Sequence, residues 1–277
     1  MRVAFISNEK AAGCREALEA VDHALRKLGA EVFSPIDIRE VSSKQADSQI
    51  AASDVVIALG GDGTIIHAAK RAAQFHRPIL GINGGHLGFM AGLETDELDQ
   101  LPALISGRYT TEKRMLLEVV VEQPEGTQRF LAMNEAVVSR GALSRLIELD
   151  LLNGTEPVMT YRADGVIVAT PTGSTAYSLS AGGPIVDPAL DCLLLTPVCP
   201  HSLYSRSYIF HAEAHLTIRP RIPADTPVYL TIDGEDGMVI SHQDTLVITR
   251  APVEASLIKI KKSSFYDVLN QKLINRR

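Results

Sequence analysis

The sequence predicts an α/β N-terminal domain with a parallel, Rossmann-like sheet, followed by a β-rich, sandwich-like C-terminal domain. In the first 107 residues, short apolar runs alternate with segments of helical periodicity, which is the pattern of a parallel sheet covered by helices. After residue 107, stretches of strand character follow one another with turn residues between them. The apolar spacing from Ser264 to Leu273 is helical again. We therefore expect domains at 1–107 and 108–255, and a C-terminal helix within 256–277 that packs on the first domain.

Composition restricts the function more than it defines it. The chain has 277 residues, a formal net charge of −6, 45% hydrophobic residues and 22% charged residues. An acidic chain of this kind argues against nucleic-acid binding and against anionic membranes. The three cysteines (Cys14, Cys192 and Cys199) form no C-x-x-C pattern, so neither a disulfide framework nor a zinc site is indicated. With no apolar run of membrane-spanning length, and Met1-Arg2 leading at once into a strand, we expect a cytoplasmic protein.

In the first domain, apolar spacing predicts a helix over Cys14–Leu28, closed by Gly29. The other elements expected there are strands at Val3–Ser7, Glu31–Phe33, Val55–Leu59 and Ile79–Ile82, and helices at Thr64–Gln74 and Glu94–Leu104. A parallel sheet binds its ligand at the carboxyl ends of its strands. That edge is therefore where a site is expected.

The stretch from Asp54 to His67 joins a buried strand to a helix through Gly60, Gly61, Asp62 and Gly63. Backbone N–H groups and a helix N-terminus then point at one place and favour an anion there. A carboxylate in such a cradle is repulsive unless it binds a metal, accepts a proton or holds a sugar hydroxyl. Asp62 is therefore the candidate for chemistry, and the alternative is a plain tight turn with Asp62 as the helix cap.

Familiar phosphate motifs do not fit this turn. The spacing is not G-x-x-x-x-G-K-[ST], and Ile66 stands where G-x-G-x-x-G needs its third glycine. A second glycine turn, Gly81–Gly88, follows the next strand and carries Asn83 and His86. Two glycine turns on one edge suit an extended polyphosphate. His86 is a candidate contact, although a lone histidine in a loop is more often solvated.

In the second domain, two constellations interrupt a series of strands. Asn134-Glu135 lies inside a predicted strand, where polar groups need partners, and the alternative is an edge or bulge pair. The segment from Asp164 to Val186 is rich in small hydroxyls that suit a flat base and a ribose, with Tyr177 able to stack. A serine hydrolase is disfavoured, because Thr172-Gly173-Ser174-Thr175 is not a G-x-S-x-G elbow. The strands expected are Met115–Val121, Arg129–Val138, Arg145–Leu152, Gly165–Ala169, His215–Ile218, Val228–Ile232 and Thr245–Ile248.

Taken together, these motifs resemble those of bacterial NAD kinases, in family order and over nearly the whole chain. The glycine-aspartate motif alone is shared with diacylglycerol kinase-like and phosphofructokinase-like enzymes, whereas its combination with Asn-Glu and the hydroxyl-rich segment is more specific. The segments that carry the resemblance are Gly60–Thr64, Gly81–Asn83, Leu87–Phe89, Asn134-Glu135, Thr170–Tyr177, Pro200–Leu203 and Ile232–Gly234.

The resemblance implies a reaction and its partners. Phosphoryl transfer would run from ATP, or in some members polyphosphate, to the adenosine 2′-hydroxyl of NAD, giving NADP. It also implies a divalent metal, usually magnesium bound through the nucleotide phosphates, and a homodimer or homotetramer. Such a reaction needs mainly alignment, charge neutralisation and a carboxylate within reach of a poorly nucleophilic hydroxyl.

The resemblance also assigns roles to residues. Asp62 would be the general base. Asn134 and Glu135 would hold the adenine and ribose side of NAD, and Asp164 would meet the nicotinamide carboxamide with help from Arg162. Many members carry Asp-Gly-Gln where this chain has Asp233-Gly234-Glu235. The glutamate at position 235 therefore puts an amide contact from that position in doubt. The remaining candidates are Gly60, Gly61, Gly63 and Thr64 at the phosphates, Thr175, Ala176, Tyr177 and Ser180 around the adenine, and His67 and Arg145 at positions where members vary.

Other readings of the same residues remain open. A kinase of the same superfamily acting on a lipid or a sugar would share the glycine-aspartate turn, but would have no evident use for the Thr170–Ser180 hydroxyls. A non-enzymatic NAD-sensing module would need no carboxylate in the phosphate loop. A dehydrogenase is disfavoured by the failed dinucleotide pattern.

Overall fold

The structure is a computed structural model that describes residues 1–8, 14–84, 88–141, 146–202, 205–223, 226–235, 237–261 and 264–274. The chain packs as two compact units, the first made of residues 1–114 and 253–277 and the second of residues 115–252. The boundary between them falls inside two long strands, β7 (Thr110–Gln123) and β18 (Thr245–Lys259). The domain limits expected from the sequence at residues 107 and 255 stay a prediction.

The first unit contains a parallel sheet, as the alternation of strand and helix patterns predicts. Its strands run in the order β2, β1, β4 and β5, and the last part of β18 pairs in parallel with β5. Two-residue strands extend it, β3 beside β1 and β6 beside β5. The bounds are β1 (Arg2–Ser7), β2 (Glu31–Val32), β3 (Ile36–Asp37), β4 (Val55–Leu59), β5 (Pro78–Asn83) and β6 (Leu93–Glu94).

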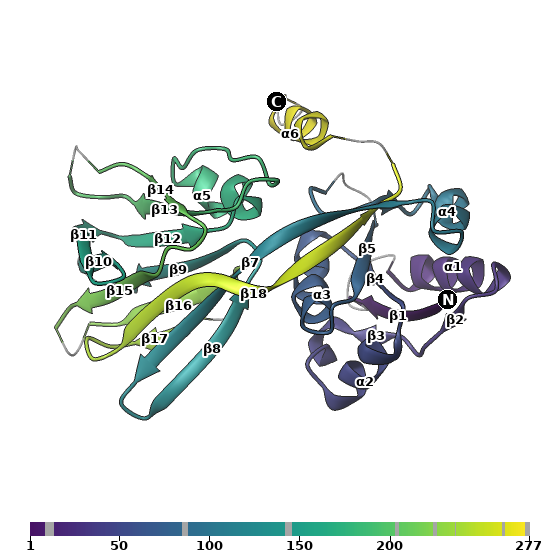
Figure 1. The fold of residues 1–277 in the computed structure, drawn as a ribbon, viewed down its shortest axis with the longest axis horizontal. Coiled ribbons are helices and arrows are strands. Elements are labelled where there is room, and N and C mark those ends of the chain that lie inside the picture. Colours follow the sequence, from purple (N-terminus) through teal and green to yellow (C-terminus); the bar gives the residue numbers. More distant parts are fainter. Residues whose placement is uncertain are drawn as a thin grey trace. The chain divides into compact units, whose positions relative to one another are not determined.

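Helices cover both faces of this sheet, with α1 and α4 on one side and α2 and α3 on the other (Figure 1). Because successive strand residues point to opposite faces, β1 packs Phe5 with Leu25 of α1 and Ile57 of β4 in one apolar cluster. The helices are α1 (Cys14–Lys27), α2 (Lys44–Ala52), α3 (Asp62–Gln74), α4 (Leu101–Ile105) and, at the C-terminus, α6 (Phe265–Ile274).

One helix predicted in this unit is wrong. The segment Glu94–Leu104 starts with the end of β6, continues through a 3₁₀ turn at Leu98–Gln100 and only then forms α4. Pro102 lies in the first turn of α4, where its missing N–H and fixed φ favour a new helix start over the interior of a longer helix. The helix α2 was not predicted. Only Ala46 and Ile50 are buried along it, which leaves little apolar periodicity to detect.

The second unit is an antiparallel β structure. One sheet has six strands in the order β14, β13, β12, β9, β16 and β17. Other strands pair in the order β11, β10, β15 and the first part of β18, and β7 forms a hairpin with β8. The bounds are β8 (Gly126–Ala132), β9 (Glu135–Arg140), β10 (Ile147–Asn153), β11 (Glu156–Ala163), β12 (Gly165–Ala169), β13 (Cys192–Val198), β14 (Tyr208–His211), β15 (Leu216–Arg221), β16 (Val228–Ile232) and β17 (Met238–Ile240).

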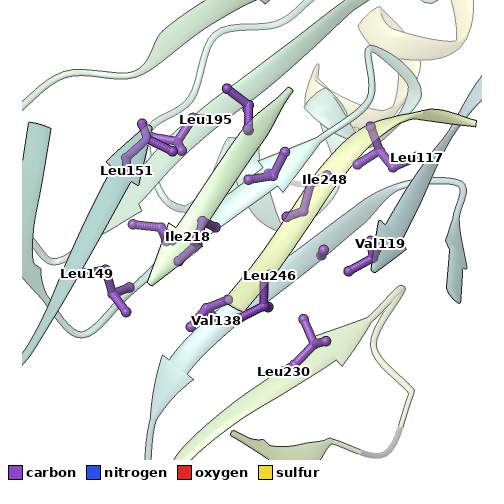
Figure 2. Packing of buried hydrophobic residues seen from close by; sticks show 14 of the residues in the cluster. Leu117, Val119, Val138, Leu149, Leu151, Leu195, Ile218, Leu230, Leu246 and Ile248 are labelled. Carbon is purple, nitrogen blue, oxygen red and sulfur yellow. The ribbon is translucent and has the colours of Figure 1, made fainter. Parts of the chain in front are cut away.

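One large apolar cluster joins most strands of this unit, and a smaller one contains Val137, Ile167 and Leu194. Leu149 of β10, Ile218 of β15 and Leu246 of β18 belong to the same cluster as Val138 of β9 and Leu230 of β16, as Figure 2 shows. The alternation along β10, with Ile147, Leu149 and Leu151 buried and Glu148 exposed, places one face of that strand in the core.

The sequence located β12 and β16 at their observed bounds but missed β11, β13, β14 and β17. Prolines explain two of these omissions. Pro157 stands near the start of the edge strand β11 and Pro197 near the end of β13, and proline within a run argues against a strand. Short helical pieces complete the fold, at Ile38–Glu40, Thr172–Thr175 and Tyr177–Ser180 (α5). Within the described ranges, no helix has the length and apolar character needed to cross a bilayer.

The packing of β10 predicts a large cost for removing a core side chain. Leu149 is 1% exposed, so Leu149→Ala should lower the free energy of unfolding by about 2–5 kcal/mol, since a cavity adds to the lost burial. The control is Val239→Ala on the edge strand β17, where the side chain is exposed. Urea denaturation of both variants measures the difference. Equal stabilities would contradict the assignment of Leu149 to the core.

Candidate functional site

Asp62 lies at the first helical position of α3, directly after the two glycines that follow β4. Its carboxylate does not cap its own helix, because the N-cap residue is Gly61 and the cap has no side-chain hydrogen bond. Instead it accepts hydrogen bonds from the backbone N–H groups of Phe89 (3.2 Å) and Met90 (3.3 Å). The helix-cap interpretation of Asp62 is therefore wrong, and the carboxylate is held by a different loop.

The loops after β4 and β5 meet at the carboxyl ends of these neighbouring parallel strands, as expected for a ligand-binding edge. Gly88 is the point of closest approach, since a Cβ there would lie 2.3 Å from Oδ1 of Asp62 and 3.3 Å from the amide nitrogen of Asn83. Asn83, at the end of β5, is buried. His86 lies outside the described residues.

The glycine turn itself is open toward solvent. Gly61 and Gly63 are exposed, and a Cβ added to either would meet no neighbouring atom within 4 Å. Thr64 is buried, and its side chain lies against Gly60. His67 is half-buried on the next turn of α3. The residues predicted to cradle phosphates therefore present backbone rather than side chains.

Two lysines of the first unit, Lys272 and Lys259, interact with Asp62, and neither was predicted from the sequence. The ammonium of Lys272 on α6 lies 3.1 Å from Oδ2 of Asp62. Burial lowers the pKa of Lys259 on β18, while the carboxylates of Glu112 and Asp62 counteract that shift. Arg114, which is buried, pairs with Glu112. An acidic chain thus supplies positive charge locally beside its candidate base.

In the second unit, Asn134 lies in a break between two strands, and Glu135 is the first residue of the second strand. β8 ends at Ala132 and β9 starts at Glu135, so the predicted strand Arg129–Val138 is wrong in its middle. The carboxylate of Asp233, a residue with φ of 51°, accepts hydrogen bonds from the backbone N–H groups of Met133 (2.9 Å), Asn134 (2.7 Å) and Glu135 (3.0 Å). Donors that bind one carboxylate cannot continue a strand ladder, which explains the break.

Glu135 is the most perturbed carboxyl group among those described here. It is 6% exposed, and its Oε2 has no hydrogen-bond partner within the described structure. Burial, reinforced by the nearby charge of Asp233, raises the pKa of Glu135 to about 7, although the backbone N–H of Tyr177 donates to it and opposes the shift. A buried acceptor without a donor is costly, and a ligand hydroxyl would satisfy it.

The hydroxyl-rich segment is more structural than the sequence predicts. The hydroxyl of Thr170 donates to the carbonyl of Met133 (2.6 Å), and that of Ser174 donates to Pro171 (2.7 Å). The hydroxyl of Ser178 pairs with Thr196 (2.9 Å). All three residues are buried, so Ser174 is not an accessible nucleophile, in keeping with the rejected hydrolase reading.

Only a short part of the hydroxyl-rich segment faces outward. Thr175 and Ala176 are half-buried, Ser180 is exposed, and Tyr177 is 46% exposed. Gly173 joins the segment to the Asn134 bend, since a Cβ on it would lie 2.1 Å from the carbonyl oxygen of Asn134. The sequence predictions at 134–135 and 175–177 therefore belong to one local structure.

The other predicted residues of this unit are Asp164, Arg162, Glu235 and Arg145. Asp164 accepts a hydrogen bond from Nε of Arg140 (2.5 Å), a partner that the sequence analysis missed. Arg162 on β11 and Glu235 after β16 are both exposed. Arg145 lies outside the described residues.

Comparison with known proteins gives a consistent family. A family model described as the ATP-NAD kinase N-terminal domain matches residues 6–109, and one described as the ATP-NAD kinase C-terminal domain matches residues 133–260. An NAD kinase of Symbiobacterium thermophilum is 48% identical over 224 residues, covering 79% of this chain and 78% of that protein. An NAD kinase of Caldanaerobacter subterraneus subsp. tengcongensis is 45% identical over 259 residues, covering 92% and 91%. Among solved structures, yeast NADH kinase complexed with NADH has a TM-score of 0.86 at 28% identity, covering 100% of this chain and 88% of that one.

The raised pKa of Glu135 predicts a pH-dependent stability. The carboxyl group of Glu135 loses its proton near pH 4.5 in the unfolded chain but only near pH 7 in the native state. The free energy of unfolding therefore falls as pH rises from about 4.5 to about 7, and this loss is constant at higher pH. Glu135→Gln cannot ionise, so its unfolding free energy relative to wild type should rise by roughly 3 kcal/mol between pH 4.5 and pH 8.

Urea denaturation of the ligand-free protein across this pH range measures the effect. The control is Glu148→Gln on β10, where the side chain is exposed. Parallel pH dependences for wild type and Glu135→Gln would show that Glu135 does not titrate with a raised pKa.

Proposed function

This chain belongs to the NAD kinase family, and from that premise we propose which of its residues carry out the transfer. It is an NAD kinase, a phosphotransferase that uses ATP to convert NAD to NADP. The observation on which the proposal rests is the carboxylate of Asp62, held by the amides of Phe89 and Met90 beside an open glycine turn. A fixed carboxylate at that place suits the role of general base.

Asp62 takes the proton of the adenosine 2′-hydroxyl as its oxygen attacks the γ-phosphorus of ATP. The bond from the γ-phosphorus to the bridging oxygen breaks, and ADP leaves with that electron pair. Because a ribose hydroxyl is a poor nucleophile near neutral pH, orientation and proton removal contribute most from the protein side. The backbone N–H groups of the glycine turn and the ammonium of Lys259 stabilise the charge that develops on the phosphoryl oxygens.

Phosphate binding is assigned to backbone. Gly61, Gly63 and Thr64 place main-chain N–H groups at the start of α3, where the helix dipole favours an anion. The N–H of Gly60 donates to the carbonyl of Ile82 (3.0 Å), so Gly60 is assigned to the shape of the turn. Lys259 and Arg114 add positive charge in the same unit. Backbone N–H groups of this kind bind the phosphates of a donor and do not recognise its nucleobase. Polyphosphate is therefore a further donor to test alongside ATP.

Magnesium is proposed to enter with the nucleotide. Among the residues that the structure describes, no three His, Cys, Asp or Glu side chains form a group able to hold a metal ion. Mg²⁺ in kinase sites is often bound by substrate phosphates with one or two carboxylates. This chain fits that arrangement, because Asp62 is the carboxylate in the first turn of α3, and the ion would neutralise phosphate charge.

The second unit is assigned to NAD. The unpartnered Oε2 of Glu135 accepts a hydrogen bond from a ribose hydroxyl, and the exposed Tyr177 stacks its ring on the adenine. Asn134, Thr175, Ala176 and Ser180 surround these two groups in the proposed binding mode. Asp164, whose carboxylate is oriented by Arg140, accepts a hydrogen bond from the nicotinamide carboxamide. Arg162, two residues earlier in the sequence, is assigned to the same part of NAD. A homodimer or homotetramer is also proposed, which light scattering would determine.

The general-base role predicts the behaviour of Asp62→Asn. An amide of the same shape cannot take the hydroxyl proton, so turnover of NAD to NADP should fall by roughly 10²- to 10⁴-fold. Coupled detection with an NADP-specific dehydrogenase, in the presence of ATP and magnesium, measures it. The control is Asp54→Asn, which removes an exposed carboxylate from the opposite end of β4 and should leave turnover unchanged.

Further arms of the assay separate the alternatives. Near-wild-type turnover of Asp62→Asn with full NAD binding would remove the base role. Replacing NAD with NADH, a diacylglycerol or a sugar tests the acceptor, and replacing ATP with polyphosphate tests the donor. Binding of NAD without release of ADP by the wild type would be the behaviour of a sensor and would contradict the kinase assignment.

A further inference from the structure

The C-terminal helix α6 brings a lysine to the proposed base. Phe265, at the start of α6, packs against Phe89 with ring centroids 6.2 Å apart. Lys272 lies two turns further along α6, with its ammonium 4.3 Å from the centroid of the Phe89 ring and 3.1 Å from Oδ2 of Asp62. The helix therefore contacts the same loop whose amides hold Asp62.

The contacts of the Asp62 carboxylate divide unequally between its two oxygens. Oδ2 accepts from the N–H of Phe89 and from Lys272, whereas Oδ1 accepts from the N–H of Met90. A carboxylate offers about four lone-pair sites. Oδ2 already accepts two hydrogen bonds, so among the described contacts the oxygen that can accept another one is Oδ1. The contact with Lys272 therefore decides which oxygen is left for a substrate hydroxyl.

The site of this contact also makes it stronger than an ordinary surface pair. The side chain of Lys272 is 28% exposed and that of Asp62 is 30% exposed, and the Phe89 ring covers the ammonium. Partial burial reduces the screening that makes exposed ion pairs weak, and the ring adds a cation–π attraction. Rotation of Asp62 away from this arrangement would break its contacts with the N–H groups of Phe89 and Met90 and with Lys272 together.

We propose that Lys272 is a positioning residue for the phosphoryl transfer, which fixes the Asp62 carboxylate in the orientation that presents Oδ1 to the acceptor hydroxyl. This inference rests on the proposed role of Asp62 as general base. Lys272 acts through Asp62 and does not bind the phosphates of ATP. Its removal therefore lowers the rate of the chemical step and leaves substrate binding in place.

The first experiment compares Lys272→Met with Lys272→Arg in the full-length protein. Lys272→Met should lower kcat by roughly 10- to 100-fold, because a misplaced catalytic group costs about that much, while KM for NAD and for ATP stays within about twofold. Lys272→Arg, which keeps a cation within reach of Oδ2, should recover most of kcat. The matched control is Gln271→Met, an exposed neighbour on α6 that should behave as wild type.

The second experiment is a double-mutant cycle with Asp62→Asn. If Lys272 acts only through Asp62, Lys272→Met has no further effect on the residual rate of Asp62→Asn. If the two residues act independently, the fold losses in rate of the two single variants multiply in the double variant. Thermal unfolding of each variant reports whether α6 remains docked. A Lys272→Met variant that does not fold would be replaced by Lys272→Gln, with the same expected loss of kcat.

Distinct results would overturn the proposal. A rise in KM for ATP at unchanged kcat would make Lys272 a phosphate ligand, and multiplicative losses in the cycle would separate it from Asp62. Normal kinetics of Lys272→Met beside an inactive Asp62→Asn would remove the positioning role alone. Full activity of Asp62→Asn would instead remove the general base on which the inference rests.

Discussion

The backbone N–H groups of Phe89 and Met90 donate to the carboxylate of Asp62, and the chemistry proposed for the first unit depends on this contact. It joins the loop after β5 to the first residue of α3, across two neighbouring parallel strands. The approach is close enough that a Cβ at position 88 would displace the carboxylate of Asp62. A carboxylate so held keeps a fixed direction at an edge that otherwise favours anions, which is why it suits proton transfer and not phosphate binding.

The second unit uses a carboxylate in a related way. Asp233 gathers three successive backbone N–H groups and thereby ends one strand before the next begins. The turn that results places Glu135 in a buried position close to the charge of Asp233, where its pKa is raised. The stability lost there is consistent with a site that awaits hydrogen-bond donors from a ligand.

Local signals in the sequence were sufficient for the parallel sheet and for the strand-to-helix turn at Gly60–Thr64, and they pointed to Asp62 and Glu135, whose roles stay predictions. They failed where structure depends on distant partners. Lys272 is separated from Asp62 by 210 positions, and Asp233 from Glu135 by 98, so no local pattern marks either contact. The hydroxyls of Thr170 and Ser174 show the converse failure. Their residue types suit a ligand, but neighbouring carbonyls accept their hydrogen bonds inside the fold.

The most direct test of the account is a single-turnover experiment with enzyme in excess over labelled ATP and with NAD saturating. The rate of γ-phosphoryl transfer in Asp62→Asn is compared with wild type, and bound NAD is measured in the same samples. The account predicts equal NAD occupancy and a transfer step slowed by roughly 10²-fold or more. Transfer at the wild-type rate with NAD fully bound would contradict it, because the proton of the acceptor hydroxyl would then leave without Asp62.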